Sequence, residues 1–198
     1  MKNLLNSGYY EENELKSFGF KFIGNNVKIA KTCNIINLEN ISIHNNVRID
    51  AFSTIISSLE HEIIIGSNIH IGSYCYFSGN EGIIIEDFCN ISQAVKIYTR
   101  NDDYSGESLT GAVIPIEFKK ITKGKVILKK HVIVGSSSVI MPNLTLEEGA
   151  AIGALSFINK NIEAWKIYAG CPAKFIKNRS NKLLDLEKIY YENYFGRK

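Results

Sequence analysis

The 198-residue sequence predicts an all-β fold, a parallel β-helix of about six triangular coils. Three observations predict it. Branched aliphatic residues recur every six positions, and a second column of small or β-branched residues follows them four positions later. The composition is rich in Ile and Asn but contains only three prolines. Many short strands joined by tight turns would produce all three.

The six-residue period is clearest in the second half of the chain. Stepping by six from Leu128 reaches only branched aliphatic residues: Leu128, Val134, Ile140, Leu146, Ile152 and Ile158. The first half repeats the step in blocks of three, separated by short insertions: Ile23, Ile29 and Ile35; Ile43, Ile49 and Ile55; Ile65, Ile71 and Phe77; Ile85, Ile91 and Ile97. Insertions of a few residues are what loops at the corners of a coil would produce.

The second column supports the same register. Its members are mostly small or β-branched: Val27, Cys33, Val47, Ser53, Ile69, Cys75, Cys89 and Val95, then Val132, Ser138, Leu144, Ala150, Ser156 and Ile162. Three of the four cysteines fall in this column. A small buried side chain is therefore a better interpretation of them than a catalytic thiol.

Each six-residue unit is interpreted as a short strand plus a turn, with the aliphatic side chain pointing inward. Three units close one coil of about 18 residues, and like residues stack into ladders as coils repeat. Gly24, Gly66, Gly72, Gly135 and Gly153 each follow a ladder residue, which suits close backbone approach or unusual dihedrals at a corner. The coils are predicted to run from about residue 22 to 163.

Three segments lie outside the repeat. Residues 1–21 precede the coils as an N-terminal cap, with a short helix predicted over 11–18, because an open solenoid end exposes core. The loop 98–125 interrupts the period after the fourth coil, and insertions of this length are usually functional or disordered. The tail 164–198 carries an amphipathic helix over 180–195, with Ser180 as a candidate N-cap.

Composition excludes several classes of function. A net charge of +3 with scattered Lys and Arg does not indicate a nucleic-acid binder. No apolar run is long enough to insert into a membrane, and the N-terminus is too polar for a signal peptide. The four cysteines lack CxxC spacing, which favours free thiols in a cytoplasmic protein and no metal site.

The C-terminal third resembles the hexapeptide-repeat acyltransferases, in their surface-polysaccharide branch of sugar N- and O-acetyltransferases. The residues that carry the resemblance are G-A-x-S at 153–156, N-K at 159–160 and G-x-P-A-K-x-I-K at 170–177, together with IYTRNDDYSGESLTG in the long loop. The resemblance covers nearly the whole chain. It implies that the coils wind left-handed, against the usual crossover rule.

The resemblance also implies a homotrimer in which acetyl-CoA, the co-substrate, lies in the groove between two subunits. Ser136, Gly153 and Ala154 would face its pantetheine arm, and Asn159 and Lys160 would lie near the lower part of that arm. Lys174 and Lys177 would meet the phosphates of the adenosine end, since lysine is a normal point-charge partner for phosphate. The implied acceptor is a sugar, nucleotide-linked in the branch that serves O-antigen or capsule synthesis.

The residue that removes the acceptor's proton is the open question. In most family members it is a histidine of the long loop, and here Asn101 stands in its place. Of the four histidines, His70 is the preferred candidate, because it falls on an outward polar column with Lys28, Arg48 and Asn90 that is expected to lie near the loop origin. His44 is interpreted as a corner residue, His61 as a solvated loop residue, and His131 as lining the CoA groove or simply exposed.

The long loop is predicted to shape the acceptor site. Asp102 or Asp103 would contact the sugar or take the departing proton, while Asn90, Arg100 and Tyr104 would bind the substrate. The alternative is a plain turn, because Asp, Ser and Gly favour turns. If the acceptor is an amine, its free base attacks without strong base assistance, so the missing loop histidine favours N-acetylation.

Three alternatives remain at this point. A sugar O-acetyltransferase of galactoside or polysaccharide type would share nearly all of these features. A zinc-dependent carbonic anhydrase on the same architecture would need three converging histidines, and the four here share no repeat column. A non-catalytic β-helix serving only as a binding module would need neither the long loop nor the C-terminal motif.

Overall fold

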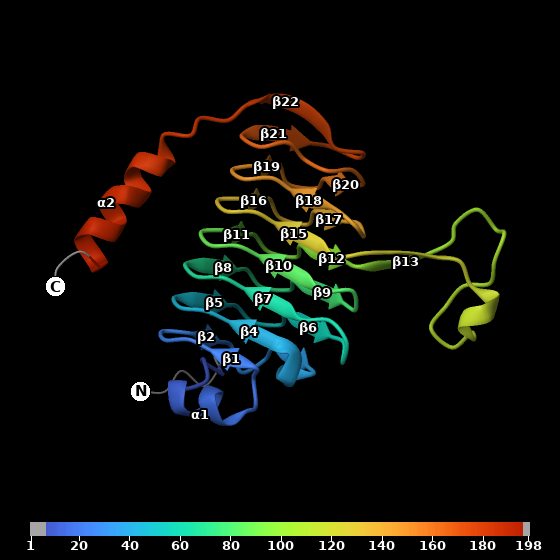
Figure 1. Ribbon diagram of the computed structural model, residues 1–198, viewed down its shortest axis with the longest axis horizontal. Coiled ribbons are helices and arrows are strands. Elements are labelled where there is room, and N and C mark those ends of the chain that lie inside the picture. Colours follow the sequence, from blue (N-terminus) through green and yellow to red (C-terminus); the bar gives the residue numbers. More distant parts are fainter. Residues whose placement is uncertain (1–6, 196–198) are drawn as a thin grey trace.

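The computed structural model describes residues 7–195 and shows a stack of triangular coils (Figure 1). The coils form three parallel sheets, one on each side of the triangle, which we number in chain order. Sheet 1 holds β1 (Phe22–Ile23), β4 (Ile41–Ile43), β7 (Ile63–Ile65), β10 (Ile83–Ile85), β15 (Val126–Leu128) and β18 (Thr145–Leu146). The left-handed parallel β-helix predicted from the sequence is confirmed.

Sheets 2 and 3 complete each coil. Sheet 2 holds β2 (Lys28–Ile29), β5 (Val47–Ile49), β8 (Ile69–Ile71), β11 (Asn90–Ile91), β16 (Ile133–Val134), β19 (Ala151–Ile152), β21 (Lys166–Ala169) and β22 (Lys174–Asn178). Sheet 3 holds β3 (Asn34–Ile36), β6 (Thr54–Ser57), β9 (Tyr76–Gly79), β12 (Lys96–Tyr98), β17 (Val139–Ile140) and β20 (Phe157–Ile158). Strand β21 stacks on the sixth coil and pairs antiparallel with β22, so the stack continues one partial turn beyond the predicted end.

The predicted ladders are confirmed by strand register. Ile29 pairs with Ile49, Ile49 with Ile71, and Ile71 with Ile91, and their side chains are buried. Of the second-column cysteines, Cys75 and Cys89 are buried and Cys33 is half-buried. Burial raises the pKa of the Cys75 thiol to about 11 and that of Cys89 to about 12, as expected for inert structural thiols.

The corners are turned by residues other than the glycines noted in the sequence. At corner 1–2, between sheets 1 and 2, left-handed φ angles occur at Asn26, Asn46, Asn68, Phe88, His131, Gly149 and Trp165. Gly135 instead provides close approach, because a Cβ there would lie 2.4 Å from the Ala154 nitrogen. Of the two reasons offered for these glycines, close backbone approach is therefore the one that the structure supports.

Helix α2 (Leu183–Phe195) folds back from β22 along corner 1–2, at the left in Figure 1. The Tyr190 hydroxyl donates to Asn68 Oδ1 at 2.9 Å, and Phe88 contacts the ring of Tyr191 edge-on. His131 is buried beneath the helix, stacked on Phe88 and 2.8 Å from Glu187. The prediction that His131 lines a groove or is exposed is therefore wrong, because the helix covers it.

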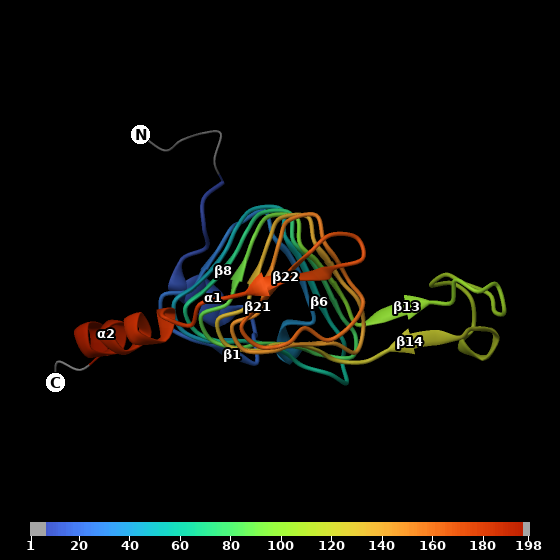
Figure 2. The same ribbon diagram turned by 90° about the horizontal axis from the view of Figure 1, so that it is seen from above.

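The loop 98–125 forms an arm that projects from corner 3–1, between sheets 3 and 1 (Figure 2). Its stem is an antiparallel pair, β13 (Arg100–Asp102) and β14 (Ile121–Lys123), and its tip contains a short 3-10 turn, η2 (Ile116–Phe118). Apolar side chains remain exposed on the arm, including Tyr104, Val113 and Ile116.

Short elements close the lower end of the stack. Helix α1 (Glu12–Ser17) buries Leu15 against the first coil, where the sequence predicted a cap, and η1 (Leu38–Asn40) links the first two coils. The part of the predicted N-terminal segment before residue 7 lies outside the described residues. Within 7–195, no helix is long and apolar enough to cross a membrane.

Candidate active site

The predicted site residues fall into two groups on different edges of the triangle. His70 and Asn90 point outward from sheet 2, while Ser136 and Ala154 lie at corner 2–3, the next corner along the chain. The arm residues 100–104 project from corner 3–1, beyond sheet 3. Within one chain the two groups do not meet.

His70 belongs to a hydrogen-bonded cluster on sheet 2. Its Nε2 lies 2.7 Å from Asp50 Oδ2, and the Tyr9 hydroxyl donates to Asp50 Oδ1 at 2.8 Å. Arg48 Nε lies 3.0 Å from the same carboxylate, and Arg48 Nη2 is 2.9 Å from His70 Nε2. The Asp50 carboxylate only accepts, so a proton on Nε2 lets the imidazole donate to Asp50 and leaves the Nδ1 lone pair as the basic site; in this tautomer the approach of Arg48 Nη2 to Nε2 is not a hydrogen bond.

Asp50 is held ionised by its neighbours. Burial opposes the charge, but the hydrogen bonds from His70 and Tyr9 and the charge of Arg48 outweigh it and lower the pKa of this carboxyl. Sequence reasoning missed Asp50. The signal was available in the register, because Asp50 follows ladder residue Ile49 and so adjoins the outward column that contains Arg48 and His70.

The outward column itself is confirmed, but its predicted position is not. Lys28, Arg48, His70 and Asn90 are successive register partners across sheet 2. The arm, however, leaves from corner 3–1, which is the corner opposite sheet 2 (Figure 2). The expectation that this column lies near the loop origin is therefore wrong within a single chain, because the period gives a residue's face and not the corner where an insertion leaves.

The residues predicted to meet CoA lie along the upper part of corner 2–3 and at the top of the stack. Neither the Ser136 nor the Ala154 backbone N–H donates a hydrogen bond to any residue in 7–195, so both can bind a ligand. Gly153 lies close to the coil above it, because a Cβ there would be 2.8 Å from that of Ala169. A carbonyl-rich chain such as pantetheine suits this edge.

Two of the lysines predicted to meet CoA lie at the top of the coil stack, beyond Ser136 and Ala154. Lys174 and Lys177 are exposed on β22 and form no ion pair with any other described residue. Asn159 and Lys160 follow β20 at corner 3–1, on another edge of the triangle from Ser136, and the Lys160 ammonium lies 5.8 Å from the Tyr168 ring. Their predicted contacts with CoA stay predictions.

On the arm, Asn101 and Asp102 are half-buried in β13, where the Asp102 carboxylate accepts the Gly111 N–H at 2.9 Å. Asp103 begins a turn, in which it accepts the Ser105 N–H at 2.9 Å and the Glu107 N–H at 3.1 Å. These bonds, led by the Ser105 N–H, lower the pKa of Asp103. Asp103 therefore organises the turn, and its contact with an acceptor stays a prediction, as it does for the exposed Tyr104.

A carboxylate that sequence reasoning missed anchors the arm. Glu81, between β9 and β10, is mostly buried and accepts Arg100 Nε at 2.6 Å, with the Lys123 ammonium at 3.9 Å and His61 Nε2 at 3.6 Å. Its own N–H donates to Thr99 Oγ1, and Thr99 is fully buried at the root of the arm. His61, predicted to be a solvated loop residue, thus belongs to this cluster. No local sequence signal marks Glu81, because its partners lie 19 and 42 positions away.

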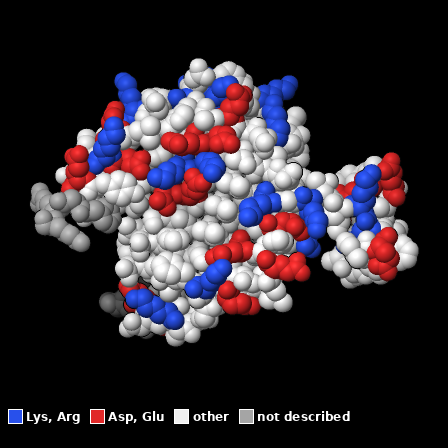
Figure 3. Space-filling view, in the orientation of Figure 1, with Lys and Arg blue, Asp and Glu red and all other residues white. Residues whose placement is uncertain are grey.

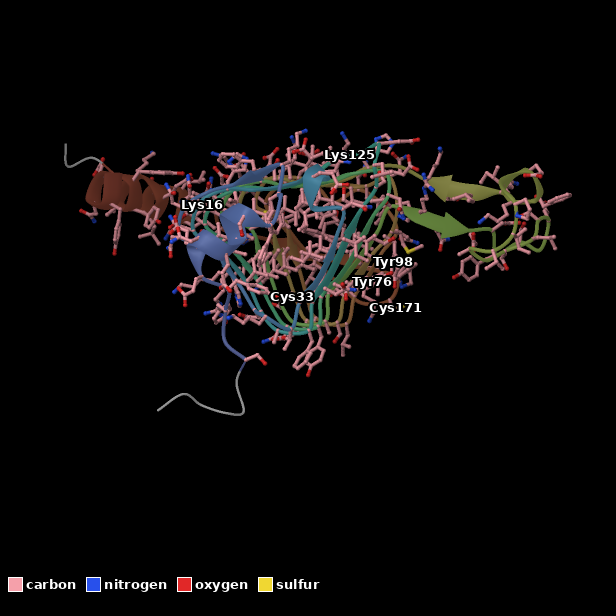
Figure 4. All side chains as sticks on the ribbon, turned by 90° about the horizontal axis from the view of Figure 1, so that it is seen from below. Lys16, Cys33, Tyr76, Tyr98, Lys125 and Cys171 are labelled. Carbon is pink, nitrogen blue, oxygen red and sulfur yellow. The ribbon has the colours of Figure 1, made fainter. Side chains whose placement is uncertain are left out.

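Two aromatic rings border this root on the outside of sheet 3. Tyr76 and Tyr98, in adjacent coils, have ring centroids 5.8 Å apart, and Figure 4 shows both on the side of the triangle from which the arm emerges. Elsewhere, Lys, Arg, Asp and Glu are intermixed on the face shown in Figure 3, without a large patch of one sign.

The remaining histidines are dispersed. His44 lies at corner 1–2, with its ring 5.0 Å from that of Phe22, as predicted for a corner residue. Among the described residues, no three His, Cys, Asp or Glu side chains are placed to hold a metal ion together.

Comparison with known proteins identifies the family. No protein-family profile matches the chain. The chain is, however, 44% identical over 188 residues to the dTDP-4-amino-4,6-dideoxy-D-glucose acyltransferase of Escherichia coli, covering 95% of this chain and 97% of that protein. The chain belongs to the hexapeptide-repeat acyltransferases. It is therefore an enzyme of the acyltransferase class.

A solved structure and a second sequence relative agree with this assignment. The N-acyltransferase AntD of Bacillus cereus, in complex with dTDP and 3-hydroxybutyryl-CoA, superposes with a TM-score of 0.90 at 43% identity, covering 95% of this chain and 98% of that one. The galactoside O-acetyltransferase of Escherichia coli K12 is 30% identical over 129 residues, covering 64% of this chain and 60% of that protein. The nearly complete match with the Escherichia coli dTDP-amino-sugar acyltransferase and with AntD favours an acyltransferase over a non-catalytic binding module.

Proposed function

We propose that this acyltransferase moves an acetyl group from acetyl-CoA to the amine of a dTDP-linked amino-deoxy sugar. The observation that carries the proposal is the match over nearly the whole chain to an acyltransferase of such a sugar, reinforced by the crystal structure of a point mutant of AntD in complex with dTDP-4-amino-4,6-dideoxyglucose and CoA. The reaction needs no redox step. The amine nitrogen bonds to the thioester carbon, the C–S bond breaks, and CoA leaves as the thiol after taking up a proton.

The donor is proposed to lie along corner 2–3, with its adenosine end at the top of the stack. The backbone N–H groups of Ser136 and Ala154 would bind pantetheine carbonyls, and Lys174 and Lys177 would pair with the phosphates. One of these N–H groups would also stabilise the oxyanion that develops as the thioester carbon becomes tetrahedral.

The proton of the attacking nitrogen must leave after the C–N bond forms. His70 is proposed to take it at Nδ1, with Asp50 as a positioning residue that holds the ring by its Nε2–H. Asp102 of the arm is the other proposed acceptor. An amine does not depend on a strong base during attack, so neither group need be indispensable.

The two groups of site residues meet only if subunits combine. We propose a homotrimer in which the arm of one subunit lies over sheet 2 of a neighbour, which brings Asp102 to the edge that carries His70. The exposed apolar side chains of the arm support this arrangement, because packing against a neighbouring subunit would remove them from water. We expect the enzyme to act in the cytoplasm, as its four free cysteines are compatible with a reducing compartment.

A panel assay tests the proposed function. The purified enzyme is incubated with acetyl-CoA and dTDP-linked sugars that carry an amine or only hydroxyls, and free thiol and product mass are recorded. Thiol release with one acetyl group gained by the amino sugar is expected. Acetylation of hydroxyl sugars alone would establish the O-acetyltransferase alternative. Running 3-hydroxybutyryl-CoA beside acetyl-CoA shows which acyl chain the site accepts.

A further inference from the structure

The segment 7–10, which precedes helix α1, runs antiparallel to the first coil. Tyr9 and Ala30 form an antiparallel bridge, and the Lys31 N–H donates to the Gly8 carbonyl at 3.0 Å. The side chain of Tyr9 lies outside the core and is 37% exposed. The segment therefore does more than cover the open end of the stack, because it holds a tyrosine on the outside of the first coil.

The Tyr9 hydroxyl reaches the second coil. It donates to Asp50 Oδ1 at 2.8 Å, and the other oxygen of the same carboxylate lies 2.7 Å from His70 Nε2 on the third coil. The three side chains thus form a continuous chain of hydrogen bonds from the N-terminal segment to His70. The two bonds join residues that are 41 and 20 positions apart in the sequence, so no local pattern marks Tyr9.

The phenol acts on the carboxylate as a hydrogen-bond donor. Burial raises the pKa of Tyr9, and the hydrogen bond to Asp50 raises it further, so the hydroxyl stays protonated. An ionised carboxylate only accepts hydrogen bonds. Tyr9 is therefore the donor of this bond, and it occupies one of the two oxygens of Asp50 without adding a charge to the cluster.

This bond limits the rotation of the Asp50 carboxylate. The terminal torsion of an aspartate side chain is broad, so the carboxylate alone does not hold one oxygen toward His70. Arg48 also contacts it, at 3.0 Å from Oδ1 and 3.3 Å from Oδ2, but the Arg48 side chain is 52% exposed, and exposed ion pairs are weak. Tyr9 has fewer torsions to restrain than an arginine, and its backbone is already bound to the first coil.

We propose that Tyr9 is a positioning residue for the acetyl transfer, which acts on His70 through Asp50. With Oδ1 occupied by the phenol, Oδ2 faces the Nε2–H of His70, and Nδ1 remains the lone pair that receives the proton of the amine. This assignment rests on the proposed function, since it presumes that His70 takes that proton. It adds that a segment outside the coil repeat contributes to the site.

Rate measurements in two backgrounds test whether Tyr9 acts through His70. Tyr9→Phe keeps the ring and removes the hydroxyl, and it should lower the single-turnover rate about two- to tenfold, with the KM values for acetyl-CoA and the acceptor unchanged. In a His70→Asn background the same substitution should leave the rate unchanged, because the group that Tyr9 positions is gone. Tyr10→Phe is the matched control, since its ring packs on Phe18 and its hydroxyl bonds to no other residue in 7–195. Thermal melting confirms that each variant is folded.

The tautomer of His70 gives a readout that needs no turnover. Nitrogen chemical shifts of isotope-labelled histidine distinguish a proton on Nε2 from one on Nδ1, and the His70 signal is assigned by its loss in His70→Asn. We expect the Nε2–H tautomer in the wild type and in Tyr10→Phe, and a larger fraction of the Nδ1–H tautomer in Tyr9→Phe.

Two results would overturn the inference: equal losses of rate in both backgrounds, which indicate a merely structural role, or an unchanged rate and tautomer in Tyr9→Phe. If His70→Asn already turns over at the wild-type rate, this inference fails while transfer to the amine stands. If the wild type acetylates only hydroxyl sugars, the proposed amine acceptor fails, and the two backgrounds compared with the hydroxyl sugar decide the role of Tyr9.

Discussion

At the residue scale, Ile71 shows how the interior ladder holds the coils together. Its side chain is fully buried between Ile49 and Ile91. Ile71→Ala should leave a cavity and lower the free energy of unfolding by about 2–5 kcal/mol. Urea denaturation measures this, with the half-exposed Ile64→Ala on the outward side of β7 as control. Ile71→Asp should be worse, because it buries an unpaired charge. Equal losses for Ile71→Ala and Ile64→Ala would contradict the ladder.

Asp50 should give the folding stability a defined pH dependence. Its pKa is lower in the folded protein than the value of about 3.9 expected when unfolded. The ionised carboxylate therefore stabilises the fold above that value, and the contribution is lost as the pH falls through the folded pKa. The wild type should exceed Asp50→Asn in stability at pH 7, with the difference shrinking below about pH 4. Denaturation of both proteins across this range checks the sign.

His70→Asn should separate an assisting base from an obligatory one. General-base catalysis is typically worth about 10²–10⁴-fold in rate, and an amine acceptor should lose less than the upper part of that range. In both proteins kcat/KM should rise with pH as the sugar ammonium deprotonates. Abolished turnover with intact acetyl-CoA binding would make His70 indispensable and favour a hydroxyl acceptor, and unchanged turnover would place the base elsewhere.

The repeat in the sequence predicted residues that play the same part in every coil. It did not reveal residues whose partners lie in other coils and come close only when the coils stack. The ladder of Ile29, Ile49, Ile71 and Ile91 follows from a repeat, so it could be recognised in the sequence alone. Asp50 acquires its role only when three coils are in register. Comparing outward positions between aligned coils would have found the pair of Asp50 and His70. No such comparison would have found Glu81.

At the element scale, the arm depends on Glu81. Arg100 and Lys123 are direct cross-strand partners in the stem, and like charges in that position repel. The Glu81 carboxylate lies against both and ties the stem to the coils. We expect this contact to set the direction of the arm, and with it the position of Asp102.

Glu81→Gln should therefore loosen the arm without unfolding the coils. We expect faster amide hydrogen exchange across 100–123, a higher acceptor KM and an unchanged acetyl-CoA KM. Glu60→Gln, an exposed carboxylate at the same corner, is the matched control. An equal rise in both KM values, or no change in exchange, would show that Glu81 does not position the arm.

Helix α2 shows a similar limit of sequence reasoning. The amphipathic pattern predicted the helix correctly, and it begins at Leu183, three residues after the candidate cap Ser180. The surface that it covers could not be predicted, because the half-buried Phe88 and the buried His131 occupy corner positions that look equivalent to solvated ones in the repeat.

At the scale of the whole molecule, a shared site predicts complementation between subunits that are impaired in different halves of the site. One variant carries Arg48→Gln with His70→Asn, and the other carries Asp102→Ala with Arg100→Gln. When the two are unfolded together in equal amounts and refolded, an intact arm meets an intact sheet 2 at about a quarter of all sites, which is one site in each mixed trimer. Activity of the mixture should exceed the sum of the two variants measured apart. A mixture no more active than its parts would place each complete site within one chain.

Helix α2 and the segment before it also affect how cooperatively the coil stack unfolds. In a simple solenoid each repeat contacts only its neighbours, so unfolding can start at one end and stop partway. Here Tyr190 reaches Asn68 on the third coil, Glu187 reaches His131 near the fifth, and Arg179 donates to the Gly149 carbonyl beside the sixth. The end of the chain thus bridges the third coil to the fifth and sixth coils, which the third does not touch. Unfolding of any one of these coils removes a contact that also holds the C-terminal segment on the others. We therefore expect the coil stack to unfold in one cooperative step, as a globular domain does.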